Sequence, residues 1–283
     1  MRRFNIVEPR SIEEACKILA ADEDVKLISG GTALLILIKH GILLPQTLVN
    51  LKKIREASAI TYDAADGLRI GGLATIYDVE SAPEVRSYYP LLAQACHVVA
   101  NIRIRNMATI GGNLAHADSQ SDPPAALVAL DASVQLTKRS GARTVKLADF
   151  LRGSYETELA RDEILTAVLV PPARADVKAT YLKFTTRSSE DRPCAGVAAW
   201  VSRANGTVEE ARVVVGAVSP APVVLSQKGF GSAKALTADV IAEIGREAAA
   251  AVDPIDDLRG PADYKRHIVG VMVRRALNEC AAV

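Results

Sequence analysis

Two diglycine segments constrain the fold of this chain more than any other feature. The first, Ser29-Gly30-Gly31-Thr32, follows a strand-like stretch at 26–28 and precedes an apolar run at 32–39 that predicts a helix. The second is Thr109-Ile110-Gly111-Gly112-Asn113. Glycine lets another group approach the backbone closely, so each segment could present several N–H groups to an anion. Either segment alone is more often a simple turn, but the two together favour a diphosphate site.

The order of the expected elements divides the chain into two parts. Strand-like stretches of the first part lie near residues 26–28, 48–51, 68–72, 133–137, 144–147 and 164–170. Helices are expected between them, and Pro171-Pro172 then interrupts the pattern. We place the main boundary there. This gives a first domain over residues 1–173, with subdomains 1–57 and 58–173.

The second part, residues 174–283, has a simpler pattern. Three strands are expected at 180–186, 195–201 and 208–218, and Asn205-Gly206 is a hairpin signal between the last two. Two helices follow, one around 238–251 and one from Pro261 onward. These elements predict a small α+β domain with a three-stranded antiparallel sheet, so the whole chain is assigned to the α+β class.

Composition and charge exclude several functions. The chain has 283 residues, of which 49% are apolar and 24% are charged, values typical of a soluble globular protein with about two domains. Lys plus Arg is 34 and Asp plus Glu is 33, so the net charge of +1 provides no basic surface for a phosphate backbone. We therefore expect no nucleic-acid partner.

The cysteines and the apolar runs indicate a location. Cys16, Cys96, Cys194 and Cys280 are far apart, without metal-ligand or disulfide spacing, so we expect buried thiols and no metal site. The chain start lacks the apolar stretch of a signal peptide. The longest apolar run, 33–38, is far shorter than the roughly 20 residues of a membrane helix. A cytoplasmic protein without a transmembrane segment is predicted.

Common catalytic motifs are missing. The sequence has no GxxxxGK[ST] phosphate loop, no complete GxGxxG after a strand, no HExxH and no GxSxG. The four histidines are scattered, with no pair at metal-ligand spacing. No side chain is therefore expected to act as a catalytic acid, base or nucleophile.

On these residues, the chain resembles the FAD-binding medium subunits of molybdenum hydroxylases, the family of aerobic carbon monoxide dehydrogenase and xanthine dehydrogenase. Residues 108–113 match its ATIGGN signature, residues 29–33 match its pyrophosphate loop with Thr32-Ala33 in place of His-Ser, and GPADYKRHIVGVMVRRAL from Gly260 resembles its last helix. The resemblance covers essentially the whole chain. It implies a two-subdomain FAD-binding domain of the vanillyl-alcohol-oxidase (PCMH) type, followed by a carbon monoxide dehydrogenase flavoprotein-like C-terminal domain.

The resemblance also implies which residues contact FAD. The two loops would hold the pyrophosphate and the ribityl chain, and Asp122 would accept hydrogen bonds from the ribityl chain or the ring. Leu165 and Val99 would pack near the ring, and Lys183, which shares one side of a strand-like stretch with Tyr181, would lie near its pyrimidine side. The full set is Leu27, Ile28, Ser29, Gly30, Gly31, Thr32, Ala33, Leu34, Val99, Ala100, Ile102, Ala108, Thr109, Ile110, Gly111, Gly112, Asn113, Asp122, Leu165 and Lys183.

The same resemblance implies partners. A large subunit would oxidise the substrate at a molybdenum cofactor, and a small subunit would pass electrons from [2Fe-2S] clusters to the FAD of this chain, in a dimer of heterotrimers. One alternative is a self-contained FAD-dependent reductase of the enolpyruvyl-glucosamine reductase type. It would need a proton donor, and Ser188, Glu190 and Asp191 are the nearest polar cluster. A subunit that has lost its cofactor is a second alternative.

Overall fold

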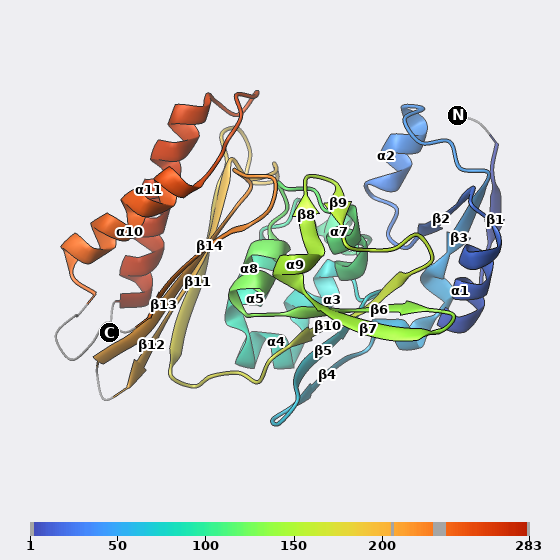
Figure 1. Ribbon diagram of the computed structural model, residues 1–283, viewed down its shortest axis with the longest axis horizontal. Helices are drawn as coiled ribbons and strands as arrows, with labels where there is room; N and C mark the ends of the chain where they lie inside the picture. The colour runs from blue at the N-terminus through green and yellow to red at the C-terminus, as the bar shows by residue number, and fades with distance from the viewer. Residues whose placement is uncertain (1–2, 205–206, 229–235, 282–283) are drawn as a thin grey trace.

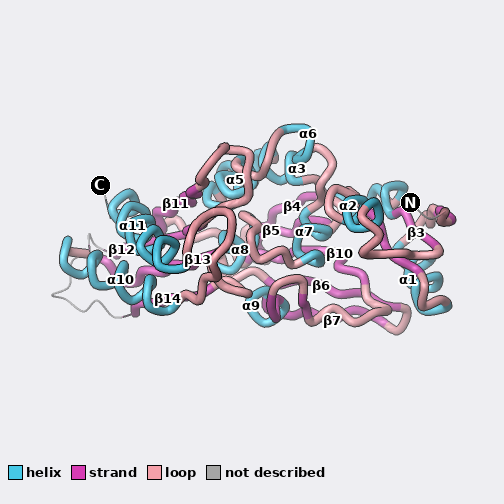
Figure 2. Tube along the Cα trace, turned by 90° about the horizontal axis from the view of Figure 1, so that it is seen from above, coloured by secondary structure: helices cyan, strands magenta, loops and turns pink. Residues whose placement is uncertain are grey.

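The computed structural model describes residues 3–204, 207–228 and 236–281. The hairpin signal at Asn205-Gly206 lies outside the described residues. Three parts follow one another along the long axis of the molecule, with residues 58–173 in the middle (Figure 1). Figure 2, turned by 90°, shows the same order. In this view α3, α5 and α6 lie along the upper side of the middle part, and β7 lies along its lower side.

The N-terminal part is a small parallel sheet with two helices. Its strands lie in the order β1-β3-β2, and β3 pairs in parallel with both neighbours. The elements are β1 (Asn5–Val7), α1 (Ile12–Ala21), β2 (Val25–Ile28), α2 (Leu34–Lys39) and β3 (Thr47–Asn50), followed by short 3-10 turns at Leu51–Lys53 and Arg55–Ser58. Ser11 caps α1 by accepting a hydrogen bond from the Glu14 amide. The strand, glycine turn, helix and strand predicted here are confirmed.

The middle part is built on a five-stranded antiparallel sheet with the order β4-β5-β10-β6-β7. These strands are β4 (Ile60–Asp63), β5 (Gly67–Gly71), β6 (Ser133–Lys138), β7 (Gly141–Lys146) and β10 (Ile164–Val170). The helices are α3 (Ile76–Ser81), α4 (Pro83–Tyr88), α5 (Pro90–His97), α6 (Ile102–Arg105), α7 (Ile110–His116), α8 (Pro123–Ala129) and α9 (Leu147–Phe150), and a small ribbon is formed by β8 (Leu151–Gly153) and β9 (Glu156–Thr157). Sequence patterning did not predict β1, β4 or this ribbon.

The C-terminal part has four antiparallel strands in chain order rather than the three predicted. They are β11 (Val177–Phe184), β12 (Ala195–Ala204), β13 (Thr207–Gly216) and β14 (Val223–Lys228), and the helices are α10 (Ala238–Ala251) and α11 (Ala262–Ala281). The missed strand β14 follows Pro220 and Pro222 directly. Prolines discourage a strand prediction, yet an edge strand tolerates them just before its start.

Strand β12, inside the C-terminal sheet, is buried on both faces. Ala198 and Trp200 of β12 belong to the core of the middle part, where the Trp200 indole N–H donates to the Ala129 carbonyl at 2.8 Å. Val197 and Ala199 point the other way and pack in a second core with α10 and α11. Alternate residues of one strand therefore stabilise two different cores, which explains why β12 is almost continuously apolar.

Two further expectations concern cysteines and membrane spans. All four cysteines are free and buried, as predicted. Among the described residues, no helix has the length and apolar character needed to cross a membrane.

Candidate cofactor site

The two diglycine loops meet across the boundary between the first two parts of the chain. The Ser29 and Thr109 hydroxyl oxygens are 2.8 Å apart and share a hydrogen bond. A Cβ atom on Gly30 would lie 2.2 Å from the Met107 carbonyl oxygen, so any other residue there would push the loops apart. Two segments far apart in the sequence, paired in the sequence analysis by their glycines, therefore lie in direct contact.

The first loop presents a row of backbone donors. Within the described residues, the N–H groups of residues 30–34 make no hydrogen bond, whereas Gly31 and Ala33 carbonyls accept from the Leu35 and Leu37 amides at the start of α2. Gly31 adopts a positive φ of 73°, which favours glycine. All five residues of this run line one cavity. Successive free amides of this kind suit an anionic group such as a diphosphate.

The second loop differs from expectation, because its amides are already used within the protein. The Ile110 and Gly111 amides donate to the Ala74 and Gly72 carbonyls, both at 2.9 Å, and the Gly112 amide donates to the Thr109 hydroxyl. A Cβ atom on Gly111 would lie 2.6 Å from the Gly72 carbonyl oxygen. The glycines of this loop allow close packing and Thr109 caps α7, while the first loop supplies the free donors.

A cavity of about 370 Å³ lies between the loops. It is lined by most of the predicted site residues, namely Leu27, Ile28, Ser29, Gly30, Gly31, Thr32, Ala33, Leu34, Ala108, Thr109, Gly111, Gly112, Asn113 and Leu165. Its remaining wall includes Leu37, Leu43, Leu51 and Ile164, which sequence reasoning missed. A cavity with free amides on one wall and leucines on another suits an anionic diphosphate joined to a flat, largely apolar ring.

Asp122, Tyr181 and Lys183 form a buried cluster between the start of α8 and strand β11. Asp122 Oδ2 accepts from Lys183 Nζ at 3.0 Å, and Asp122 Oδ1 accepts from the Tyr181 hydroxyl at 2.9 Å. The Lys183 and Asp122 side chains are only 6% and 5% exposed. Burial raises the pKa of Asp122 to about 6 even though Lys183 and Tyr181 favour its charged form. The shared side predicted for Tyr181 and Lys183 is confirmed, and both oxygens of Asp122 already have partners.

A second cavity of about 280 Å³ adjoins this cluster. Lys183, Ala100, Arg105 and Ser189 are among its lining residues, and Ala100 has a positive φ of 41°. Sequence reasoning assigned no site role to three residues that hold these walls in place. Tyr181 bonds Asp122, Arg105 bonds the Val99 carbonyl, and Gly72 accepts from the Gly111 amide. Gly72 could have been found, because it forms a third diglycine with Gly71 at the end of a predicted strand.

The remaining predicted residues are placed outside the two cavities. Ile102 lies on α6 and is 47% exposed. Ile110 is fully buried in the core beneath the second loop. Val99 packs against the same core and is half-buried.

Comparisons with known proteins agree with this geometry. Residues 2–173 match the family model described as the FAD binding domain in molybdopterin dehydrogenase, and residues 180–280 match the CO dehydrogenase flavoprotein C-terminal domain. The carbon monoxide dehydrogenase medium chain of Hydrogenophaga pseudoflava is 34% identical over 280 residues, covering 98% of this chain and 96% of that protein. The glyceraldehyde dehydrogenase medium chain of Sulfolobus acidocaldarius is 30% identical over 281 residues, covering 98% of both chains.

A solved structure confirms the fold class. Carbon monoxide dehydrogenase from Hydrogenophaga pseudoflava superposes with a TM-score of 0.91 at 34% identity, covering 99% of this chain and 97% of that one. Fold and site together define a flavoprotein of the oxidoreductase class. The chain belongs to the FAD-binding medium chains of molybdopterin dehydrogenases, and its cofactor is FAD. The resemblance found in the sequence is confirmed.

Proposed function

We propose that this chain is the electron-exit subunit of a molybdenum hydroxylase. It would take electrons from the [2Fe-2S] clusters of a small subunit and pass them to an external acceptor, while a large subunit oxidises the substrate at a molybdenum cofactor. Bound FAD supplies redox chemistry that no amino-acid side chain provides. The protein would therefore only need to bind, orient and tune the cofactor.

The observation that carries this proposal is the run of free amides at residues 30–34 beside an apolar cavity. The amides would bind the diphosphate of FAD, and the leucines of the N-terminal part that line the cavity would receive the adenine. Leu165 of β10 would pack near the flavin ring. Ala100 and Lys183, which line the second cavity, would face the isoalloxazine ring, and Val99 would pack near it from the adjoining turn. The other predicted residues would support these contacts, Ile110 from within the core.

Domain limits, assembly and location complete the proposal. The limits 1–173 and 174–283 are supported by the two separate family models. The break between residues 57 and 58 is supported by a small core that comes mainly from the N-terminal part, with Ile164 of β10 added to it. The medium-chain names of the relatives support a complex with small and large subunits. The dimer of heterotrimers and the cytoplasmic location stay predictions.

The identity of the released flavin is the first test of the proposed function. Flavin released by heat from the purified chain should be FAD and not FMN, because the free amides suit the diphosphate that FMN lacks. Chromatography of the released flavin decides the point. Recovery of FMN would contradict the site, and a purified complex without any flavin would support a subunit that has lost its cofactor.

Turnover is the second test. The isolated chain should oxidise no organic substrate, and activity should appear only with the iron-sulfur and molybdenum subunits. Full activity of the chain alone would favour the self-contained reductase. Two residues of the polar cluster suggested for that reductase already have partners, since Glu190 accepts from the Asn101 side-chain Nδ2 and Asp191 pairs with Arg187.

A further inference from the structure

Two cations bind successive backbone carbonyls at the wall of the second cavity. Lys183 Nζ donates to the Val98 carbonyl at 2.8 Å, and Arg105 Nη1 donates to the Val99 carbonyl at 3.1 Å. Ala100, the next residue, has the positive φ of 41° and lines the cavity. A residue with a side chain seldom adopts this conformation unless its surroundings impose it.

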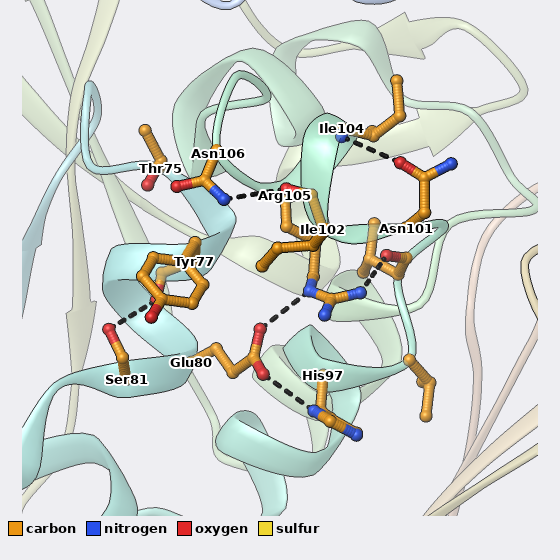
Figure 3. Close-up of polar contacts among 12 residues, drawn as sticks. Thr75, Tyr77, Glu80, Ser81, His97, Asn101, Ile102, Ile104, Arg105 and Asn106 are labelled. Atoms are coloured by element: carbon orange, nitrogen blue, oxygen red, sulfur yellow. Dashed lines mark hydrogen bonds and ion pairs between the residues drawn. The ribbon is translucent and has the colours of Figure 1, made fainter.

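Each of these cations is neutralised by its own carboxylate. Lys183 pairs with Asp122, and Arg105 Nε donates to Glu80 Oε2 at 2.8 Å. The Arg105 and Glu80 side chains are only 11% and 16% exposed. Figure 3 shows Glu80 of α3 reaching Arg105 with one oxygen and His97 of α5 with the other, at 2.7 Å from His97 Nδ1. The pair therefore joins α3, α5 and α6 directly beside the turn at 98–100.

The planar guanidinium of Arg105 explains why one side chain can serve two partners. Its Nε donates to the Glu80 carboxylate while its Nη1 donates to the Val99 carbonyl, so the carboxylate fixes the direction of the second bond. Glu80 itself does not line the cavity. Its effect on the turn is carried by Arg105, which bonds the Val99 carbonyl, and by His97, which lines the cavity and directly precedes Val98.

We infer that Glu80 and Arg105 are positioning residues that hold the 98–100 turn in the shape required by the flavin ring. This inference rests on the proposed placement of the isoalloxazine ring against Val99 and Ala100. Lys183 secures one carbonyl of the turn and the Glu80–Arg105 pair secures the next. Without that pair, the turn would be free to relax, and its wall would no longer match the ring.

The test uses the full chain, freed of flavin and titrated separately with FAD and with ADP. ADP carries the adenine and the diphosphate but no flavin ring, so it probes the first cavity alone. Arg105→Gln and Glu80→Gln should weaken FAD binding by about tenfold, the effect of losing a charge-assisted hydrogen bond. Their affinity for ADP should stay within about twofold of that of the unmodified chain. Visible circular dichroism of the bound flavin should change as well, since it reports the surroundings of the ring.

Matched variants separate positioning from general stability. Arg103 lies on the same helix, is exposed and forms no ion pair in the described chain. Arg103→Gln should therefore alter neither the affinity for FAD nor the circular dichroism of the bound flavin. Arg105→Lys keeps the charge but not the planar group with several donors. Its affinity for FAD should fall between those of the unmodified chain and Arg105→Gln. If Arg105→Gln does not fold, Glu80→Gln carries the test, because it preserves the shape of the side chain.

The outcomes distinguish this inference from the proposed function. Unchanged FAD affinity and dichroism in Glu80→Gln and Arg105→Gln would overturn the positioning role alone. Equal losses of FAD and ADP affinity would also overturn it, because they would indicate general destabilisation. If the unmodified chain binds ADP as tightly as FAD, the ring contributes nothing, and the proposed placement of the ring fails together with the inference.

Discussion

Replacing Lys183 by methionine should lower the free energy of unfolding, because the buried Asp122 carboxylate would lose its cation. The substitution keeps a side chain of similar length but removes the cation 3.0 Å from Asp122 Oδ2. Of the two partners described for its carboxylate, Asp122 would keep the Tyr181 hydroxyl, and its side chain is only 5% exposed. Removing one member of a buried ion pair typically lowers the free energy of unfolding by about 3–5 kcal/mol. We expect a loss in this range above neutral pH.

The loss should depend on pH in a defined direction. The pKa of Asp122 is about 6 in the folded protein against an ordinary value of 3.8, a difference equivalent to about 3 kcal/mol. The folded state therefore binds this proton more tightly, and the resulting stabilisation is complete below 3.8 and lost as the pH rises through 6. Without the Lys183 cation, the pKa of Asp122 should rise further. The stability deficit of Lys183→Met should then shrink as the pH is lowered.

Urea unfolding of flavin-free protein at about pH 8 and about pH 5.5 measures both effects. Lys138→Met, at an exposed lysine on β6, is the matched control and should change stability little at either pH. Adding Asp122→Asn to Lys183→Met should recover part of the stability and remove its pH dependence. A deficit of the same size at both pH values, or one below about 1 kcal/mol at the higher pH, would refute the reasoning.

Three further predictions concern the loops. Gly30→Ala should separate them and lower the flavin content of the purified chain, because its Cβ would lie 2.2 Å from the Met107 carbonyl oxygen; full flavin occupancy would contradict this. Gly111→Ala should lower the Tm of the flavin-free chain by several degrees, since its Cβ would lie 2.6 Å from Gly72; an unchanged Tm would show that the contact relaxes freely. Thr109→Val should cost about 1–2 kcal/mol in urea unfolding by removing the α7 cap, whereas Thr109→Ser should cost less.

Local patterns in the sequence predicted the parts of the fold that depend on neighbouring residues. The glycine turn before α2 and the alternation that places Tyr181 beside Lys183 both act within a few residues of the chain. The pairing of the diglycine loops was also foreseen, because both motifs were expected to bind the same ligand, although only the first loop has free amides. The ATIGGN block added the family and hence the cofactor.

The rest depended on partners distant in the sequence. Gly111 was expected to expose its amide, but Gly72, which accepts that hydrogen bond, comes from another strand end. Arg105 could not be assigned a role because Glu80 and the Val99 carbonyl meet it only in the folded chain. Burial of Asp122 likewise has no local signal, so its raised pKa could be derived only from the structure.

The free amides of residues 30–34 link the lifetime of this protein to the supply of its cofactor. A ligand that binds only the folded state stabilises it by an amount that grows with ligand concentration, about 4 kcal/mol at a thousand times the Kd. Unloaded chains would open more often and be degraded sooner, because proteases act on the open population. When flavin is scarce, the cell would accumulate fewer subunits rather than many inactive ones, and the chains that survive to meet their partners would already be loaded.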